Sequence, residues 1–205
     1  MSNPPIPLPP MDANVQRYTF TAGMRIDADG ANGHDGSGRA AYADGKNGTN
    51  PLDYLANAGK PGNWWGIVVD GKGVPIKQSA TDPAPGYYIS TTSYTHSGKL
   101  AADPARYLDA AVDRFIVLPR HWRAEARGVV LGCHCVIYDL RTTRSCDAVV
   151  GDFGPKDKVG EGSIALARFF GINSDPKTGG TDDKRFRYTF YPGVVAQGYR
   201  LIPAV

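Results

Sequence analysis

Two carboxylates, Asp152 and Glu161, lie on either side of a glycine-bounded turn. Asp152 follows the apolar run 148–150, at the mouth of a predicted strand, and Glu161 lies between Gly160 and Gly162, where no bulky neighbour blocks a large ligand. Hydrolysis of a glycosidic bond needs two such carboxyl groups, because one protonates the leaving oxygen and the other activates water or attacks the sugar carbon. The pair is therefore a candidate active site for glycan cleavage. The alternative is structural, since a carboxylate in a turn ahead of a helix often only caps it.

The same segment resembles the signature of glycoside hydrolase family 75, the chitosanases. In that pattern an Asp after a strand, a glycine-containing turn and a Gly-Glu-x-Ser-Ile-x-Leu-Ala run carry the two essential acids. Asp152 and Glu161 occupy those positions here, the latter in the run 160–167. Residues 26–32 (IDADGAN) resemble the N-terminal motif of the family, and the pair 54–59 and 61–66 resembles its bacterial members. The resemblance spans about residues 18–193 and implies an inverting enzyme.

The two acids would take different roles. Glu161 precedes Ser163, at the start of a predicted helix, where the helix dipole and free amides favour a carboxylate. Glu161 would then be the general base and Asp152 the general acid, although the reverse assignment stays open. The residues expected to bind substrate are Asp27, Asp29, Asn32, Trp65, Tyr88 and Ser90.

Each of these binding residues has a structural alternative. Asp27 and Asp29 could instead shape a glycine-rich turn, and Trp65, with Trp64, could anchor the core. Tyr88 and Ser90 could be ordinary barrel surface. Residues 27–30 do not fit a calcium loop, because Ala31 occupies a ligand position and no Glu closes the loop. No metal or cofactor is expected.

The net charge of the chain bears on which glycan it would bind. The chain has 23 Lys and Arg against 20 Asp and Glu, a formal net charge of +3, whereas a protein that binds polycationic chitosan should present an acidic groove. A local acidic patch is predicted from Asp27, Asp29, Asp35, Asp152, Asp157 and Glu161. A mildly basic surface would suit an anionic glycan such as peptidoglycan equally well. No basic run indicates nucleic acid, and no stretch has the length of a membrane span.

The length of 205 residues fits one domain. Residues 1–16, rich in proline, are expected to form a disordered arm, and residues 17–205 a single glycoside hydrolase catalytic domain. No signal peptide is visible, but the function would place the protein outside the cell or in the periplasm. A polysaccharide substrate is the expected partner, and the chain is expected to be a monomer.

Twenty-five Gly and 16 Pro favour many turns and short strands. The fold class predicted is mainly β, a compact, double-psi-like barrel with two or three short helices. Strands are predicted at 17–25, 65–69, 74–78, 87–91, 115–118, 129–138, 146–151, 185–191 and 199–202. Helices are predicted at 105–112 and from the cap Ser163 to the stop Gly171, with one or two helical turns at 53–58.

Cys133, Cys135 and Cys146 allow buried free thiols or a cross-strand disulfide. A metal site is disfavoured because His134 would point away from its two Cys neighbours on a regular strand.

Two functions from different classes follow. One is an endo-acting hydrolase of chitosan, with peptidoglycan or another amino-sugar glycan as the substrate variant. The other is a catalytically idle glycan-binding module or immunity-type partner. The presence of both acids favours the enzyme.

Overall fold

The computed structural model describes residues 16–32, 59–60, 62–119, 128–154, 159–176 and 178–203. Most of the expected proline arm, the predicted helical turns at 53–58, and the patch residues Asp35 and Asp157 lie outside these ranges.

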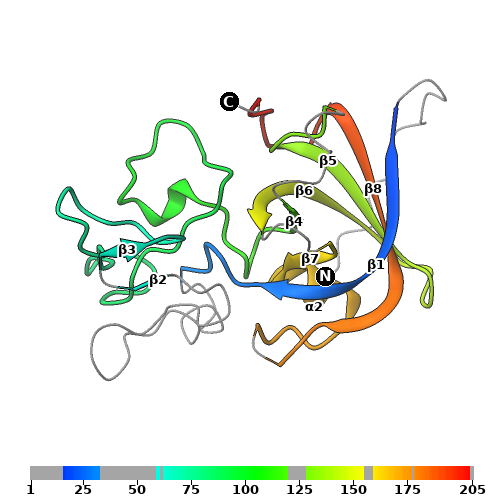
Figure 1. The fold of residues 1–205 in the computed structure, drawn as a ribbon, viewed down its shortest axis with the longest axis horizontal. Coiled ribbons are helices and arrows are strands. Elements are labelled where there is room, and N and C mark those ends of the chain that lie inside the picture. Colours follow the sequence, from blue (N-terminus) through cyan, green and yellow to red (C-terminus); the bar gives the residue numbers. More distant parts are fainter. Residues whose placement is uncertain are drawn as a thin grey trace.

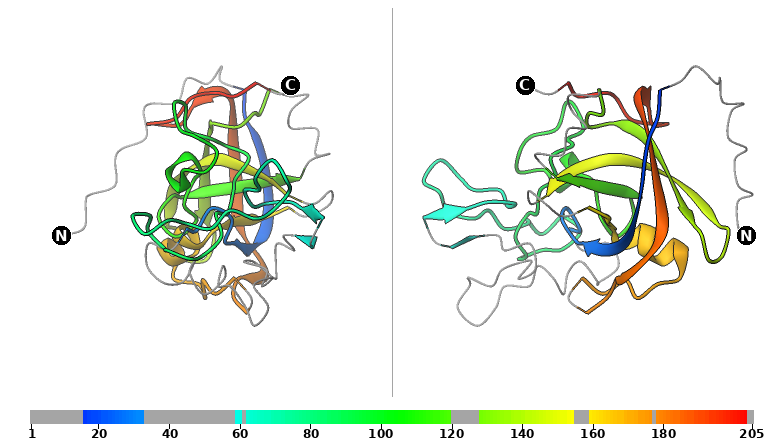
Figure 2. Two further views of the ribbon diagram at one scale, coloured as in Figure 1. Left: turned by 90° about the vertical axis from the view of Figure 1, so that its left-hand side faces the viewer. Right: turned by 45° about the vertical axis from the view of Figure 1, so that its right-hand side comes forward.

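Six strands form a closed barrel, in the spatial order β1-β7-β4-β6-β5-β8 (Figure 1). Their bounds are β1 (Tyr18–Asp27), β4 (Phe115–Pro119), β5 (Cys133–Asp139), β6 (Ser145–Gly154), β7 (Glu161–Ser163) and β8 (Thr181–Val195). Two short strands, β2 (Gly59–Lys60) and β3 (Asn63–Trp64), pair with each other and lie apart from the barrel, as Figures 1 and 2 show. The prediction of a mainly β barrel is confirmed.

The barrel interior is filled by alternate residues of its longer strands. On β5, Cys133, Cys135 and Ile137 are buried while the residues between them are partly exposed, and on β8 the buried set is Phe186, Tyr188 and Phe190. Because side chains on a strand alternate between faces, every second residue packs into one core. The three cysteines are free and buried, which favours the thiol alternative over the disulfide.

One α-helix, α2 (Ile164–Phe170), follows directly on β7, and its buried residues belong to the same core as the barrel strands. Its start and stop are as predicted: Ser163 accepts a hydrogen bond from the Leu166 amide at 3.2 Å, and Gly171 adopts a left-handed conformation with φ of 69°. The Ser163 hydroxyl also accepts from the Phe115 amide of β4 at 3.2 Å. A single side chain thus caps the helix and joins it to the barrel.

The segment between β3 and β4 corrects several expectations. The predicted strands at 65–69, 74–78 and 87–91 pair only at single positions, namely Ile67 with Ser90, Val69 with Pro75 and Lys77 with Tyr88. The predicted helix at 105–112 is a 3₁₀ turn, Pro104–Arg106, although Asp103 caps it as predicted. Among the described residues, α2 is the only α-helix, and the predicted helical turns at 53–58 lie outside those residues.

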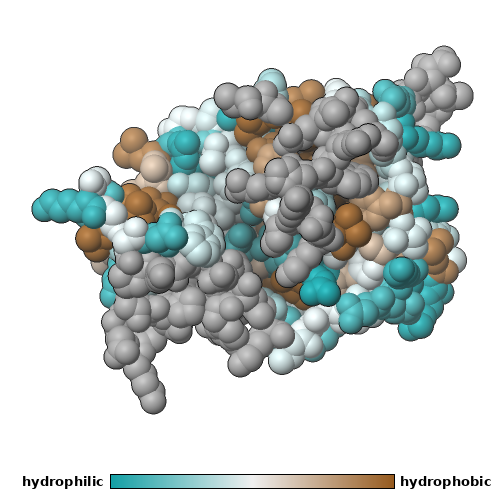
Figure 3. Space-filling model, viewed as in Figure 1, coloured by the Kyte–Doolittle hydropathy of each residue, from teal (hydrophilic) through white to brown (hydrophobic). Residues whose placement is uncertain are grey.

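Among the described residues, no helix is both long and apolar enough to span a membrane. On the face shown in Figure 3, the coloured hydrophobic residues are scattered among hydrophilic ones.

Candidate active site

Strand β4 sets the relative positions of the two candidate catalytic acids. Its residue Val117 pairs with Asp152 of β6 on one side and with Glu161 of β7 on the other. Residues paired in register direct their side chains to the same face of a sheet, so both acids lie on the face of Val117. With one strand between them, their Cα atoms are about 10 Å apart.

A β-bulge at Gly151 turns Asp152 toward this face. On β4, Ile116 pairs with Val150 and the next residue, Val117, pairs with Asp152, so Gly151 is the extra residue. A methyl group added at Gly151 would lie 2.6 Å from Leu108 Cδ1 and 2.7 Å from Phe115 Cβ, so the bulge requires glycine. Without the extra residue, Asp152 would be displaced by one position and turned to the opposite face.

Three donors converge on one oxygen of Asp152. Its Oδ1 accepts hydrogen bonds from the Ser93 amide at 2.9 Å, from the Phe153 amide at 2.7 Å and from the Ser93 hydroxyl. The side chain is buried, with 5% of the residue surface exposed. Hydrogen bonds to a charged group are the strong ones, and donors directed at a carboxylate favour its ionised form.

Glu161 extends from β7 toward the end of β6. A methyl group added at Gly154 would lie 3.1 Å from Glu161 Oε2 and 2.8 Å from Val117 Cγ1. The carboxyl group therefore passes over β4 and lies against Gly154, on the strand that carries Asp152. Glu161 itself is partly exposed.

The glycines beside Glu161 have a packing role that the sequence analysis did not identify. Gly160 has φ of 80°, and a methyl group there would lie 2.6 Å from the Gly23 carbonyl oxygen of β1. A methyl group at Gly162 would lie 2.7 Å from Leu166 Cδ2. These contacts let β7 fit between β1 and the helix, which fixes the position of Glu161.

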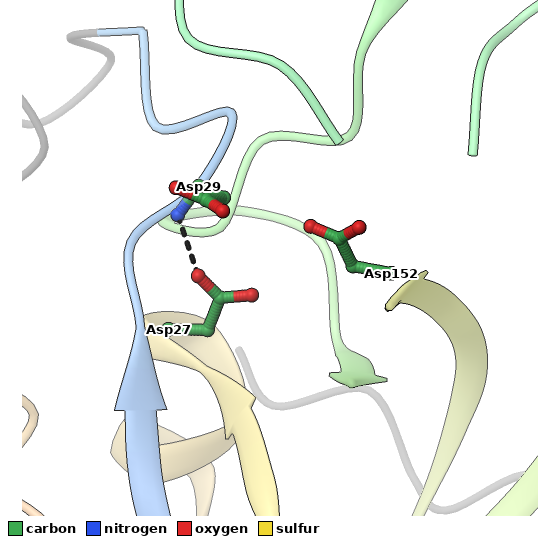
Figure 4. A group of neighbouring side chains, drawn as sticks. All are labelled: Asp27, Asp29 and Asp152. Carbon is green, nitrogen blue, oxygen red and sulfur yellow. Dashed lines mark hydrogen bonds between the residues drawn. The ribbon is translucent and has the colours of Figure 1, made fainter. Parts of the chain in front are cut away.

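Asp27 and Asp29 join Asp152 in an acidic cluster (Figure 4). Each of the three side chains contributes an oxygen that lies within 4.8 Å of the other two. Asp27 is at the end of β1, and its Oδ1 accepts a hydrogen bond from the Asp29 amide at 2.8 Å, so the turn after β1 holds the two acids together. Oxygen atoms in this spacing suit a hard metal cation or an ammonium group. The structure thus unites three acids that the sequence analysis had assigned to one site.

Asn32 and Ser90 anchor the loop that carries Asp29. Asn32 Oδ1 accepts from the Ser90 amide at 2.9 Å, and its Nδ2 donates to the Ser90 carbonyl oxygen at 3.2 Å. The Ser90 hydroxyl accepts from the Gly30 amide at 2.9 Å. Both residues are buried, so their observed role is to join the two segments, and direct contact with substrate stays a prediction.

The two aromatic candidates differ in exposure. Trp65 is 45% exposed, whereas its neighbour Trp64 packs against the core. Trp64 therefore has the core role considered from the sequence, and Trp65 keeps the substrate-binding role as a prediction. Tyr88 is buried, and the Lys77 ammonium lies 5.6 Å from the centre of its ring. Trp65 is therefore the aromatic candidate that a ligand can reach from solvent.

Ser93 is the residue at this site that the sequence analysis missed. From this segment the sequence analysis selected Tyr88 and Ser90, whereas Ser93 lies between Thr92 and Tyr94, both of which are buried. Its contact with Asp152 joins residues far apart in the chain and leaves no local signal.

No protein-family model matches the chain, and no curated protein matches it.

Proposed function

We propose that the protein is an endo-acting glycoside hydrolase that cleaves the β-1,4 linkages of chitosan by inversion, with Asp152 and Glu161 as the catalytic pair. The observation that carries the proposal is the position of both acids on one face of the barrel, in register with Val117 and beside the acidic cluster. Two carboxyl groups separated by one strand leave room for a sugar linkage and a water molecule.

The acidic cluster supports chitosan as the substrate. Asp27, Asp29 and Asp152 place three carboxyl groups together in a chain whose formal net charge is +3. A glucosamine unit carries an ammonium group, which such a cluster attracts and which an N-acetyl group lacks. The acidic cluster therefore supplies the local negative charge that binding of a polycation needs, although the net charge of the chain is positive.

The hydrogen bonds favour Asp152 as the general base, the reverse of the assignment favoured from the sequence. A base must be ionised before the reaction, and the three donors on Oδ1 stabilise that form. Glu161 would then protonate the leaving oxygen. A separation of the carboxyl groups of roughly 6.5–9.5 Å is typical of inverting enzymes, and the Cα separation of about 10 Å across β4 is compatible with it.

The finer identity belongs to the same proposal. The pairs β1–β7 and β4–β6 are parallel within an otherwise antiparallel barrel, a feature compatible with a double-psi arrangement. We further propose that the chain is a bacterial-type member of glycoside hydrolase family 75. It would act as a single catalytic domain and a monomer, outside the cell or in the periplasm, where its polysaccharide substrate is found.

A reducing-end assay of the purified protein on chitosan and on peptidoglycan tests the proposal. Asp152→Asn and Glu161→Gln should each lower kcat on chitosan by about 10²–10⁴-fold, the usual contribution of general acid–base catalysis. Asp182→Asn, which changes an acid whose side chain is 97% exposed on β8, is the matched control and should retain activity.

The outcomes separate the alternatives. Activity on peptidoglycan alone, lost in both variants, would retain the catalytic pair and refute chitosan as the substrate. Binding of chitosan without cleavage of either glycan would refute the enzyme and leave an idle glycan-binding module.

A further inference from the structure

Ser93 holds Asp152 through both its backbone and its side chain. Its amide and its hydroxyl both donate to Asp152 Oδ1, and the hydroxyl oxygen accepts a hydrogen bond from the Phe153 amide at 3.3 Å. The hydroxyl hydrogen of Ser93 therefore points to the Asp152 carboxylate. The hydroxyl oxygen accepts a hydrogen bond from β6, the strand that carries Asp152.

The segment around Ser93 is itself fixed to the barrel. The Tyr94 amide donates to the carbonyl oxygen of Gly151 at 2.9 Å, so the segment is bonded to the bulge that orients Asp152. Next to it, the Thr92 hydroxyl donates to the Tyr94 carbonyl oxygen at 2.8 Å and accepts from the Leu108 amide at 3.1 Å. Thr92 and Tyr94 are buried, so the position of Ser93 is determined from both sides.

We propose that Ser93 is a positioning residue that holds the Asp152 carboxylate ionised and in one orientation. The inference rests on the proposed function, in which Asp152 is the general base.

The charges around Asp152 explain why such a residue is needed. Asp27 and Asp29 face it from β1 and the following turn, and Glu161 lies on the same face of the sheet two strands away. Like charges disfavour ionisation, whereas hydrogen bonds to the carboxylate favour it. Among the described residues of β1, Arg25 pairs in register with Glu161. The Ser93 hydroxyl offsets part of the repulsion by direct contact.

The test compares Ser93→Ala with Ser93→Thr and with Ser97→Ala, an exposed serine in the same segment. The pKa of Asp152 is measured by NMR in protein labelled with ¹³C at aspartate carboxyl carbons, the signal being assigned with Asp152→Asn. We expect Ser93→Ala to raise this pKa by about one pH unit, because a strong hydrogen bond to the charged form is lost. The acidic limb of the pH profile of kcat on chitosan should move in the same direction, with kcat about 10-fold lower and KM little changed. Ser93→Thr keeps a hydroxyl group and should retain the wild-type pKa of Asp152 and the wild-type pH profile. Ser97→Ala should alter neither the pKa nor the profile.

An unchanged pKa of Asp152 in folded Ser93→Ala would overturn the proposal. So would a raised KM with an unchanged pH profile, since that pattern indicates a contact with substrate. The titration needs no substrate, so it decides the role of Ser93 even if the wild-type protein fails to cleave chitosan, a result that would refute the proposed function alone.

Discussion

Gly154→Ala is a sharp test of the position of Glu161. The added methyl group would lie 3.1 Å from Glu161 Oε2 and 2.8 Å from Val117 Cγ1, both closer than ordinary van der Waals contact. The carboxyl group must therefore move by a few tenths of an ångström, and the Val117 methyl by more. Overpacking of this kind costs about 1–3 kcal/mol of the free energy of unfolding. Because a displacement of about 1 Å at a catalytic group costs about 10²-fold in rate, we expect kcat to fall by about 10-fold.

The assay is kcat on saturating chitosan, with urea unfolding of the same preparation to measure stability. Gly71→Ala is the matched control, since a methyl group there meets nothing within 4 Å and Gly71 has no positive φ. It should change the free energy of unfolding by less than about 0.5 kcal/mol and leave kcat unchanged. A Gly154→Ala protein that is destabilised but retains the wild-type kcat would refute the reasoning, because Glu161 could not then act from the position described.

Two further predictions concern the barrel. Burial alone would raise the pKa of Asp139, but hydrogen bonds from Thr142 and Arg141 and the charge of Arg185 lower it. Because the folded pKa is depressed, this carboxylate stabilises the fold above its unfolded pKa of about 4, and the contribution is lost as pH falls through the folded value. Asp139→Asn should cost about 3 kcal/mol at pH 7 by urea unfolding and less at pH 3, and equal costs would contradict this. Burial raises the pKa of Cys146 to about 11 and that of Cys135 well above its usual range, so both should resist iodoacetamide at pH 8 until the protein unfolds, as mass spectrometry would show.

Local signals predicted those parts of the fold that local contacts determine. Ser163 and Gly171 mark the ends of α2 because the cap bonds to an amide three residues on and the stop needs only a left-handed residue. The alternation of β5 and the apolar run before Asp152 were readable for the same reason, since one buried face imposes a period of two.

Tertiary pairing overrode the local signals elsewhere. Asp103 and Pro104 start a helix, yet it ends at Arg106, because Tyr107 pairs with Thr95 and the Leu108 amide bonds to the Thr92 hydroxyl instead of to its own turn. Strand β7 is absent from the strands predicted from the sequence. Its three residues are extended because β1 and β4 pair with it on both sides.

The distance between the two acids shows most clearly what a sequence can and cannot predict. The turn between Asp152 and Glu161 suggested a pair but does not fix its geometry. Val117, from a strand much earlier in the chain, pairs with both and sets their separation, and the bulge at Gly151 selects the face on which Asp152 lies. At the bulge, Gly151 lies so close to Leu108 and Phe115 that a methyl group would clash, and no spacing of acids encodes this fit. Residue type and order can therefore indicate the chemistry of this site, whereas the choice between inversion and retention depends on a strand that carries neither acid.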